Sequence, residues 1–179
     1  ALQRSIGDAQ TELNRAAGNR IGVARAYGNL GMLAADESDY VAAREMYEKA
    51  IPILREERDE SSLAATLVNL GSIFLLTHDY ASARGLYEEA LVKQRELGDQ
   101  QRIATSLNNL GSLARLEGNR QVSEALFRES LQLSRLIGDR RLTVSAIQGL
   151  AKMALDRGDP LHAALLGPFA YVLAHQVAG

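Results

Sequence analysis

The chain contains no cysteine and only three prolines, and aromatic residues make up only 5% of its 179 residues. The absence of cysteine excludes disulfide bonds and thiolate metal sites, and it is compatible with a reducing compartment. With so few rings, small and aliphatic side chains must fill the core, which suits helices that approach one another closely. No apolar run reaches the roughly 18 residues that a membrane span needs.

Neither sign of charge dominates, since the net charge is −2 and the isoelectric point lies near 6.0. A nearly neutral chain offers no basic surface to a polyanion, so we expect no nucleic-acid partner. No signal peptide is visible, and we expect a cytoplasmic protein without a membrane partner. The chain begins at Ala1 in mid-pattern, which we interpret as part of something longer.

What the chain does contain is a repeat. The triplet Asn29-Leu30-Gly31 recurs as Asn69-Leu70-Gly71 and Asn109-Leu110-Gly111, and a changed copy stands at Gly149-Leu150-Ala151. Each copy follows the last by 40 residues. Self-similarity at a fixed period indicates an architecture in which each repeat buries its apolar face against its neighbour.

Each repeat is predicted to be a helix, a turn and a second helix. The phase divides the chain into a half repeat (1–18), three full repeats (19–58, 59–98, 99–138) and a degenerate repeat with a C-terminal cap (139–179), together forming one domain. Short polar side chains that suit helix N-caps precede the first helices at Asn19, Asp59, Asp99 and Asp139, and the second helices at Asp39, Asp79, Asn119 and Asp159. The second helices are predicted over 40–57, 80–97 and 120–137.

Glycine and proline mark the breaks in this pattern. Gly18, Gly98 and Gly138 precede the caps and can end a helix in a left-handed conformation, whereas Arg58 interrupts the series, so its turn is predicted to differ. Pro52 is predicted to kink or break its helix. Gly167-Pro168 is predicted to divide the last helix.

The central glycine of the triplet needs a packing reason, because a glycine in mid-helix costs roughly 1 kcal/mol against alanine. In the first full repeat, Tyr27, Leu30, Gly31 and Ala34 share one helix face. We expect another backbone to approach this glycine closely. Small residues of the second helix such as Ala43 would then face the glycine, and rings such as Tyr47 would face the leucines.

The spacing of an aromatic or leucine residue, Leu-Gly, Ala-x3-aromatic and a small residue resembles the tetratricopeptide repeat (TPR). The resemblance implies an all-α fold, a right-handed α-solenoid of antiparallel helix pairs. The long 40-residue form and Leu97-Gly98-Asp99 are similar to repeats of the kinesin-light-chain and polarity-adaptor type. They are also similar to the repeat region of bacterial regulators that carry a signal-transduction ATPase and often a DNA-binding domain, and the end of the chain favours this second group.

Polar residues left over from packing form a stripe on the first helices. By the resemblance, this face lines a concave groove that binds a peptide. The candidate residues are Arg25, Asn29, Met32, Asn69, Ser72, Thr105, Asn108, Asn109, Ser112, Arg115, Gln148 and Lys152. An asparagine amide can bond both the C=O and the N–H of an extended peptide. Alternatively, the asparagines tie one repeat to the next through neighbouring backbone.

No constellation for catalysis is present. His78, His162 and His175 are scattered, no serine has a His/Asp partner pattern, and the Gly-x4-Gly-Lys phosphate loop is absent. We therefore expect no enzyme activity, no metal and no cofactor. The first hypothesis is a protein-binding module, a sensor or docking region of a larger bacterial regulator. The alternative is a structural, autoinhibitory or oligomerisation role, with self-association through the apolar tail at 168–179.

Overall fold

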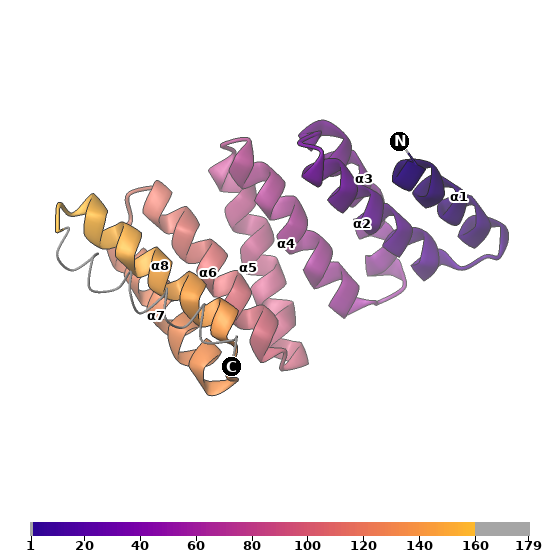
Figure 1. Ribbon diagram of the computed structural model, residues 1–179. Helices are drawn as coiled ribbons and strands as arrows, with labels where there is room; N and C mark the ends of the chain where they lie inside the picture. Colours follow the sequence, from indigo (N-terminus) through magenta and orange to yellow (C-terminus); the bar gives the residue numbers. More distant parts are fainter. Residues whose placement is uncertain (1, 160–179) are drawn as a thin grey trace, which may run out of the picture. The chain divides into compact units, whose positions relative to one another are not determined.

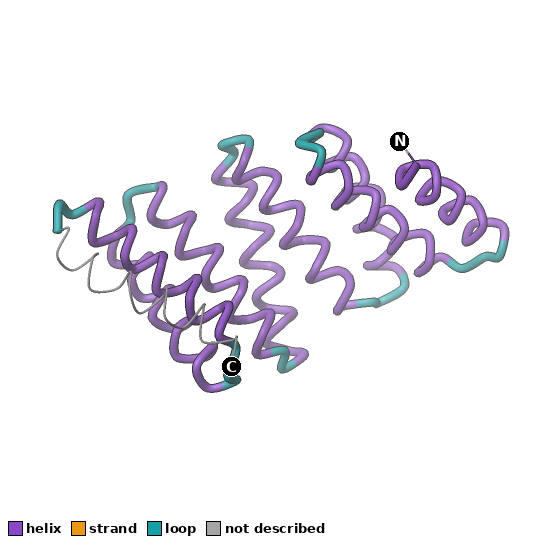
Figure 2. The backbone as a smooth tube through the Cα atoms, in the orientation of Figure 1, coloured by secondary structure: helices purple, strands orange, loops and turns teal. Residues whose placement is uncertain are grey.

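The computed structural model describes residues 2–159, which form eight helices and no strand (Figures 1 and 2). The helices are α1 (Leu2–Ala16), α2 (Arg20–Asp36), α3 (Tyr40–Glu56), α4 (Glu60–Leu76), α5 (Tyr80–Leu97), α6 (Gln100–Leu116), α7 (Arg120–Leu136) and α8 (Arg140–Asp156). The predicted all-α fold of consecutive antiparallel helix pairs is confirmed. The predicted break at Gly167-Pro168, the C-terminal cap and the self-associating tail lie outside the described residues.

The helices gather into two compact units, Ala1–Lys93 and Gln94–Gly179, and the boundary falls inside α5. In the first unit, α2 packs against α1 and α3 and also lies beside α4, the first helix of the next repeat. In the second unit, α7 packs against α6 and α8, and α6 lies beside α8. Each unit thus stacks first helices beside first helices. The expectation of one domain over residues 1–179 stays a prediction.

The helix starts predicted from Asn19 to Asp139 are confirmed by their caps, and the start predicted after Asp159 lies outside the described residues. The side chains of Asn19, Asp59 and Asp139 accept hydrogen bonds from the backbone N–H three residues later, over 2.9, 3.1 and 3.0 Å. Asp39 and Asp79 cap α3 and α5 in the same way, each over 3.1 Å. Two second helices end one residue earlier than predicted, because residues 57 and 137 serve as C-caps.

The prediction that the turn at Arg58 differs from its equivalents is wrong. Arg58 has a φ of 55°, close to the 67°, 68° and 70° of Gly18, Gly98 and Gly138. Its turn closes with the same bonds, since the Asp59 N–H donates to the Leu54 carbonyl over 3.0 Å. The helix that follows and its cap require a left-handed residue at this position. Arginine adopts that conformation with some strain, which glycine would not have.

Helix α3 continues through Pro52 from Tyr40 to Glu56, so the expected break is absent. Proline removes the hydrogen bond that its N–H would make to the carbonyl of Glu48. Both residues are exposed, and water can satisfy that carbonyl.

The prediction about the central glycines was also wrong in one respect. A Cβ on Gly31 or Gly71 would lie 2.7 or 2.8 Å from the ring of Tyr47 or Tyr87, and a Cβ on Gly111 would lie 3.0 Å from Phe127. The close neighbour is therefore an aromatic ring of the second helix and not another backbone. With no Cβ on the glycine in its way, the ring at this position is almost completely buried in all three full repeats.

Candidate functional site

The first helices of unit 1 carry two asparagines at the same repeat position. Asn29 on α2 and Asn69 on α4 are both exposed, and the two helices lie side by side. Within residues 2–159 neither amide makes a hydrogen bond. Asn109, half-buried on α6 of unit 2, makes none with the described residues either. These three side chains therefore do not tie one repeat to the next through hydrogen bonds in the described structure.

Other candidates in unit 1 have partners inside the chain. Arg25 donates to the cap residue Asp59 over 3.0 Å and so connects α2 to the start of α4. Ser72 bonds the carbonyl of Val68 and lies 3.0 Å from the buried hydroxyl of Tyr87. These two side chains are therefore committed to internal contacts. Met32 is 52% exposed and lies on the same helix as Asn29.

In unit 2 the internal ties are stronger. Asn108 donates to Ser145 of α8 over 2.9 Å, and Arg115 pairs with Asp156 of α8 over 2.9 Å. Thr105 donates to the carbonyl of Gln101 in its own helix. The hydrogen bond that ties this repeat to the next is therefore made by Asn108 and not by its neighbour Asn109. The remaining candidates are the half-buried Ser112 and the exposed Gln148 and Lys152.

Asn29, Asn69 and Asn109 are followed at the same repeat position by Gly149, where there is no room for a side chain. A Cβ at this position would lie 2.3 Å from the ring of Phe127. The ring therefore contacts both Gly111 of its own repeat and Gly149 of the next. The last described repeat has no side chain where α2 and α4 present an amide.

A cavity of about 320 Å³ opens between α1 and α2 of unit 1. Apolar side chains make much of its lining, and Gln10, Asn29 and Asp36 are its polar groups. Ile6 and Met32 at its edge are 56% and 52% exposed. Two candidate groove residues, Asn29 and Met32, therefore lie beside an apolar hollow that the sequence did not predict.

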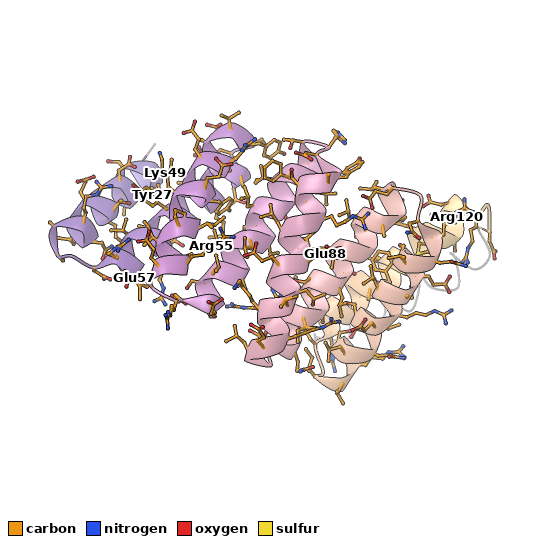
Figure 3. All side chains as sticks on the ribbon, turned by 180° about the vertical axis from the view of Figure 1, so that it is seen from behind. Tyr27, Lys49, Arg55, Glu57, Glu88 and Arg120 are labelled. Carbon is orange, nitrogen blue, oxygen red and sulfur yellow. The ribbon has the colours of Figure 1, made fainter. Side chains whose placement is uncertain are left out.

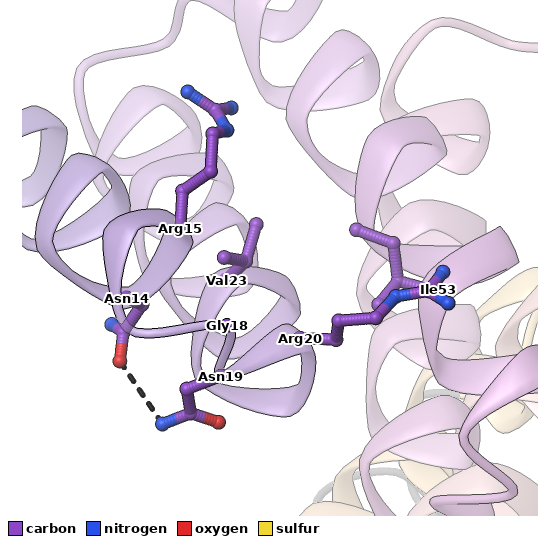
Figure 4. A pocket seen from close by; sticks show the side chains of 7 residues that line it. All are labelled: Asn14, Arg15, Gly18, Asn19, Arg20, Val23 and Ile53. Carbon is purple, nitrogen blue, oxygen red and sulfur yellow. Dashed lines mark hydrogen bonds between the residues drawn. The ribbon is translucent and has the colours of Figure 1, made fainter.

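A second hollow recurs in both units at the junction between repeats. In unit 1 it has a volume of about 200 Å³ and is lined by α1, α2 and Ile53 of α3 (Figure 4). In unit 2 a cleft of about 410 Å³ uses the equivalent residues Arg95, Ile103 and Leu133. At the intervening junction Lys93 stands where the others have Ile53 and Leu133, and it pairs with Glu60 over 2.6 Å. The lysine in place of an aliphatic residue could have shown from the sequence that this junction differs from the other two.

Ion pairs join successive second helices, and Figure 3 labels Arg55, which belongs to one of them. Arg55 pairs with Glu89 over 2.9 Å, and Arg95 pairs with Glu129 over 3.1 Å. At the first junction the place of these glutamates is taken by Lys49, which lies over the ring of Tyr27 at 6.0 Å. Within each unit, these pairs balance the charge between neighbouring second helices and support their stacking.

Two pKa shifts follow from burial and capping. Burial raises the pKa of the Tyr47 phenol to about 12, and the charge of Asp36 adds to the shift. Burial by itself raises the pKa of Asp59, but hydrogen bonds from Ser62 and Arg25 outweigh it and hold the pKa below its usual value. Both shifts follow from burial and from the contacts that hold the helices together.

Two features are absent from residues 2–159. No three metal-ligating side chains converge there. Within the same range, no helix combines the length and hydrophobicity that crossing a bilayer requires.

Comparison with protein families decides the relationship. Two models described as tetratricopeptide repeat match residues 22–96 and 103–137, together more than half of the chain. The chain belongs to the tetratricopeptide repeat proteins. Repeats of this kind generally mediate protein–protein interaction and are generally non-catalytic scaffolds. The TPR resemblance read from Leu-Gly and the following aromatic residue is thereby confirmed.

Solved structures share the fold. The crystal structure of BtubC (BKLC) from P. vanneervenii has a TM-score of 0.79 and 23% identity over 89% of this chain and 66% of that chain. Aspartyl phosphate phosphatase F from Bacillus subtilis has a TM-score of 0.66 and 14% identity over 88% of this chain and 50% of that chain. The TPR chain thus spans about two thirds and half of these proteins. A search of curated protein sequences gives no match.

Proposed function

We propose that this TPR chain binds an extended segment of a partner protein along its first helices, through the amides of Asn29 and Asn69. The observation that carries the proposal is that both amides are exposed and unbonded on adjacent helices, among residues 2–159, while nearby polar side chains are used internally. An exposed amide offers two donors and an acceptor to a peptide backbone.

The geometry sets the spacing of such contacts. Packed helices lie roughly 8–10 Å apart, and an extended peptide rises about 3.3 Å per residue. One asparagine therefore meets about every third residue of the bound segment. Backbone recognition of this kind is tolerant of peptide sequence, so selectivity comes from the side chains nearby, such as the exposed Met32.

Within a longer protein, the chain would act as the sensor or docking region of a bacterial cytoplasmic regulator, without catalysis of its own. This role is supported by the Leu97-Gly98-Asp99 signature, which is similar to repeats of such regulators. The neighbours share the fold alone, so the proposal rests on the unbonded amides.

The test compares two asparagines of the same chain. A peptide is first selected against the wild-type chain from a random displayed library, and its affinity and the chain's thermal midpoint are then measured for Asn69→Ala and Asn108→Ala. We expect Asn69→Ala to weaken binding about 10-fold or more, as for the loss of one or two hydrogen bonds, with the midpoint unchanged.

Asn108→Ala serves as the matched control. It removes the bond to Ser145, so it should lower the thermal midpoint. Unchanged affinity for the Asn69→Ala variant, a fall in its midpoint, or failure to select any peptide would each contradict the proposal.

A further inference from the structure

Helix α4 differs from the other first helices of the full repeats in its charge. Its one charged residue is Glu60, which stands at the start of the helix and pairs with Lys93 of α5 over 2.6 Å. The helices α2, α6 and α8 each carry at least two charged residues beyond their first position. From residue 61 to residue 76, α4 therefore offers no charge to a partner.

The groove face of α4 presents an amide, a small side chain and a leucine in succession. Asn69 and Leu76 are seven residues apart and share one face of the helix, with Ser72 between them. The Ser72 hydroxyl is turned inward, since it bonds the carbonyl of Val68 and the hydroxyl of Tyr87. Leu76 is 54% exposed. An exposed apolar group thus lies two turns from the unbonded amide.

The fold does not require an apolar residue where Leu76 stands. Helix α6 also ends with a leucine, Leu116, but α2 and α8 end with Asp36 and Asp156. Because two repeats accept a carboxylate at this position, packing within the repeat does not explain the leucine. A single exposed leucine is ordinary on a protein surface, but this one shares its helix face with Asn69, which bonds no described residue.

Helix α2 adds a second apolar side chain beside Ser72. Met32 occupies the repeat position of Ser72 on α2, which lies beside α4 in unit 1, and Met32 is 52% exposed. Helix side chains tilt toward the N-terminus, so Leu76 leans back over the turn that holds Ser72. Ser72 is therefore flanked by two exposed apolar side chains, one from each helix.

We propose that α4 selects the sequence of the bound segment, so that a peptide held by Asn69 places an apolar side chain over Ser72, between Met32 and Leu76. A charged side chain is rejected there, because its loss of water is offset by no opposite charge on residues 61–76. Asn69 binds the peptide backbone, whereas Leu76 discriminates between side chains. This inference rests on the proposed function, since it assigns a partner chemistry to the same groove.

The experiment begins with the peptides that a random displayed library yields against the full wild-type chain. We expect one peptide position to be enriched in leucine, isoleucine, methionine or phenylalanine. Replacing that residue by lysine should weaken binding about 5-fold or more, and Leu76→Asp should weaken binding of the original peptide by a similar factor. The lysine peptide and Leu76→Asp together should recover affinity through a new ion pair.

Leu97→Asp is the matched control, because Leu97 is also the last residue of its helix and is 48% exposed, but it lies on a second helix. This variant should bind the peptide like the wild type. If Asn69→Ala weakens binding and Leu76→Asp does not, or if the selected peptides show no apolar position, the inference is wrong and the proposed function stands.

Two other results would assign the surface differently. Unchanged affinity for Asn69→Ala would contradict the proposed function, and this inference with it. Self-association of the chain in light scattering, lost in Leu76→Asp, would show that a second copy covers Leu76, and this would overturn the inference.

Discussion

The α1/α2 pair of unit 1 and the α7/α8 pair of unit 2 are the same part of the repeat, and they differ in what lies between and beside their helices. In the second pair the Phe127 ring fills the space at Gly149 and α6 packs alongside. In the first pair Gly7 replaces the ring and a cavity remains. In repeat proteins each helix is held mainly by its nearest neighbours. The two pairs therefore share their helices and differ in how the space between them is filled.

The largest expected difference between the two pairs concerns their central apolar side chains. Phe127→Ala should lower the stability of the chain by about 3–5 kcal/mol, because the ring is buried and touches two helices. Leu30→Ala should cost about 2 kcal/mol, since Leu30 already borders a cavity. Urea denaturation followed by circular dichroism measures both. Equal losses would remove the contrast in packing between the pairs.

A methyl group added to each pair should act in opposite ways. Gly149→Ala should lower stability by about 1–3 kcal/mol, because its Cβ would lie 2.3 Å from a ring that cannot move. Gly7→Ala should change stability by less than about 0.5 kcal/mol. The gain in helix propensity offsets a shift of the Leu30 side chain into the cavity. Thermal midpoints of the two variants, compared with the wild type, decide this, and a greater loss for Gly7→Ala would contradict the comparison.

Replacing each of the two aspartates by alanine should change the stability of the chain in opposite directions. Asp156→Ala leaves Arg115, whose side chain is only 24% exposed, without its partner, and should cost about 1 kcal/mol. Asp36→Ala removes, from a helix C-terminus, a carboxylate that pairs with no described side chain, and should raise stability by about 0.3–1 kcal/mol. High salt should shrink both effects. Destabilisation by Asp36→Ala would mean that this carboxylate is already compensated.

The turns before α2 and α8 both carry glycine, whereas the turn before α4 has the same conformation but carries Arg58. Gly18 and Gly138 make the turn before α2 and α8, while Arg58 makes the equivalent turn with a φ of 55°. Arg58→Gly should raise stability by about 1 kcal/mol, because a side chain in the left-handed region is strained. Gly138→Ala should lower stability by a similar amount. No gain for Arg58→Gly would show that contacts of the arginine offset its strain.

The smallest effect is a difference in pH dependence between the caps. Asn19 caps α2 with a neutral amide, whereas Asp139 caps α8, and the backbone N–H of Leu142 lowers the pKa of that carboxyl. A lowered pKa in the folded state means that the stabilisation is full above the unfolded pKa near 3.9. It is lost as the pH falls through the folded value. Asp139→Asn should flatten the decline in thermal midpoint below about pH 4, and an unchanged decline would contradict this assignment.

Local features of this chain could be predicted from the sequence. Helix starts followed from Asn and Asp at fixed positions, and the family followed from the in-phase Leu-Gly and aromatic residues. These signals lie within a few residues of the feature they determine, and repetition made them readable. The turn at Arg58 was missed because residue preference was taken to decide a conformation that the neighbouring helices impose.

Contacts between helices could not be predicted in the same way. The polar stripe included both Asn108, which bonds Ser145, and Asn69, which bonds no described residue. The two asparagines stand one residue apart in the repeat, and one residue turns a side chain by about 100° around the helix. Asn108 therefore faces the next helix, whereas Asn69 does not. The cavity at Gly7 likewise depends on the Leu30 side chain across the interface.

The most direct measurement is hydrogen exchange of the asparagine side-chain amides by NMR. The account predicts slow exchange for Asn108 and fast exchange for Asn29 and Asn69 in the free chain, with Asn69 slowed when the selected peptide binds. Protection of Asn69 in the free chain, or unchanged exchange in the complex, would contradict the claim that packing leaves these amides available to a partner.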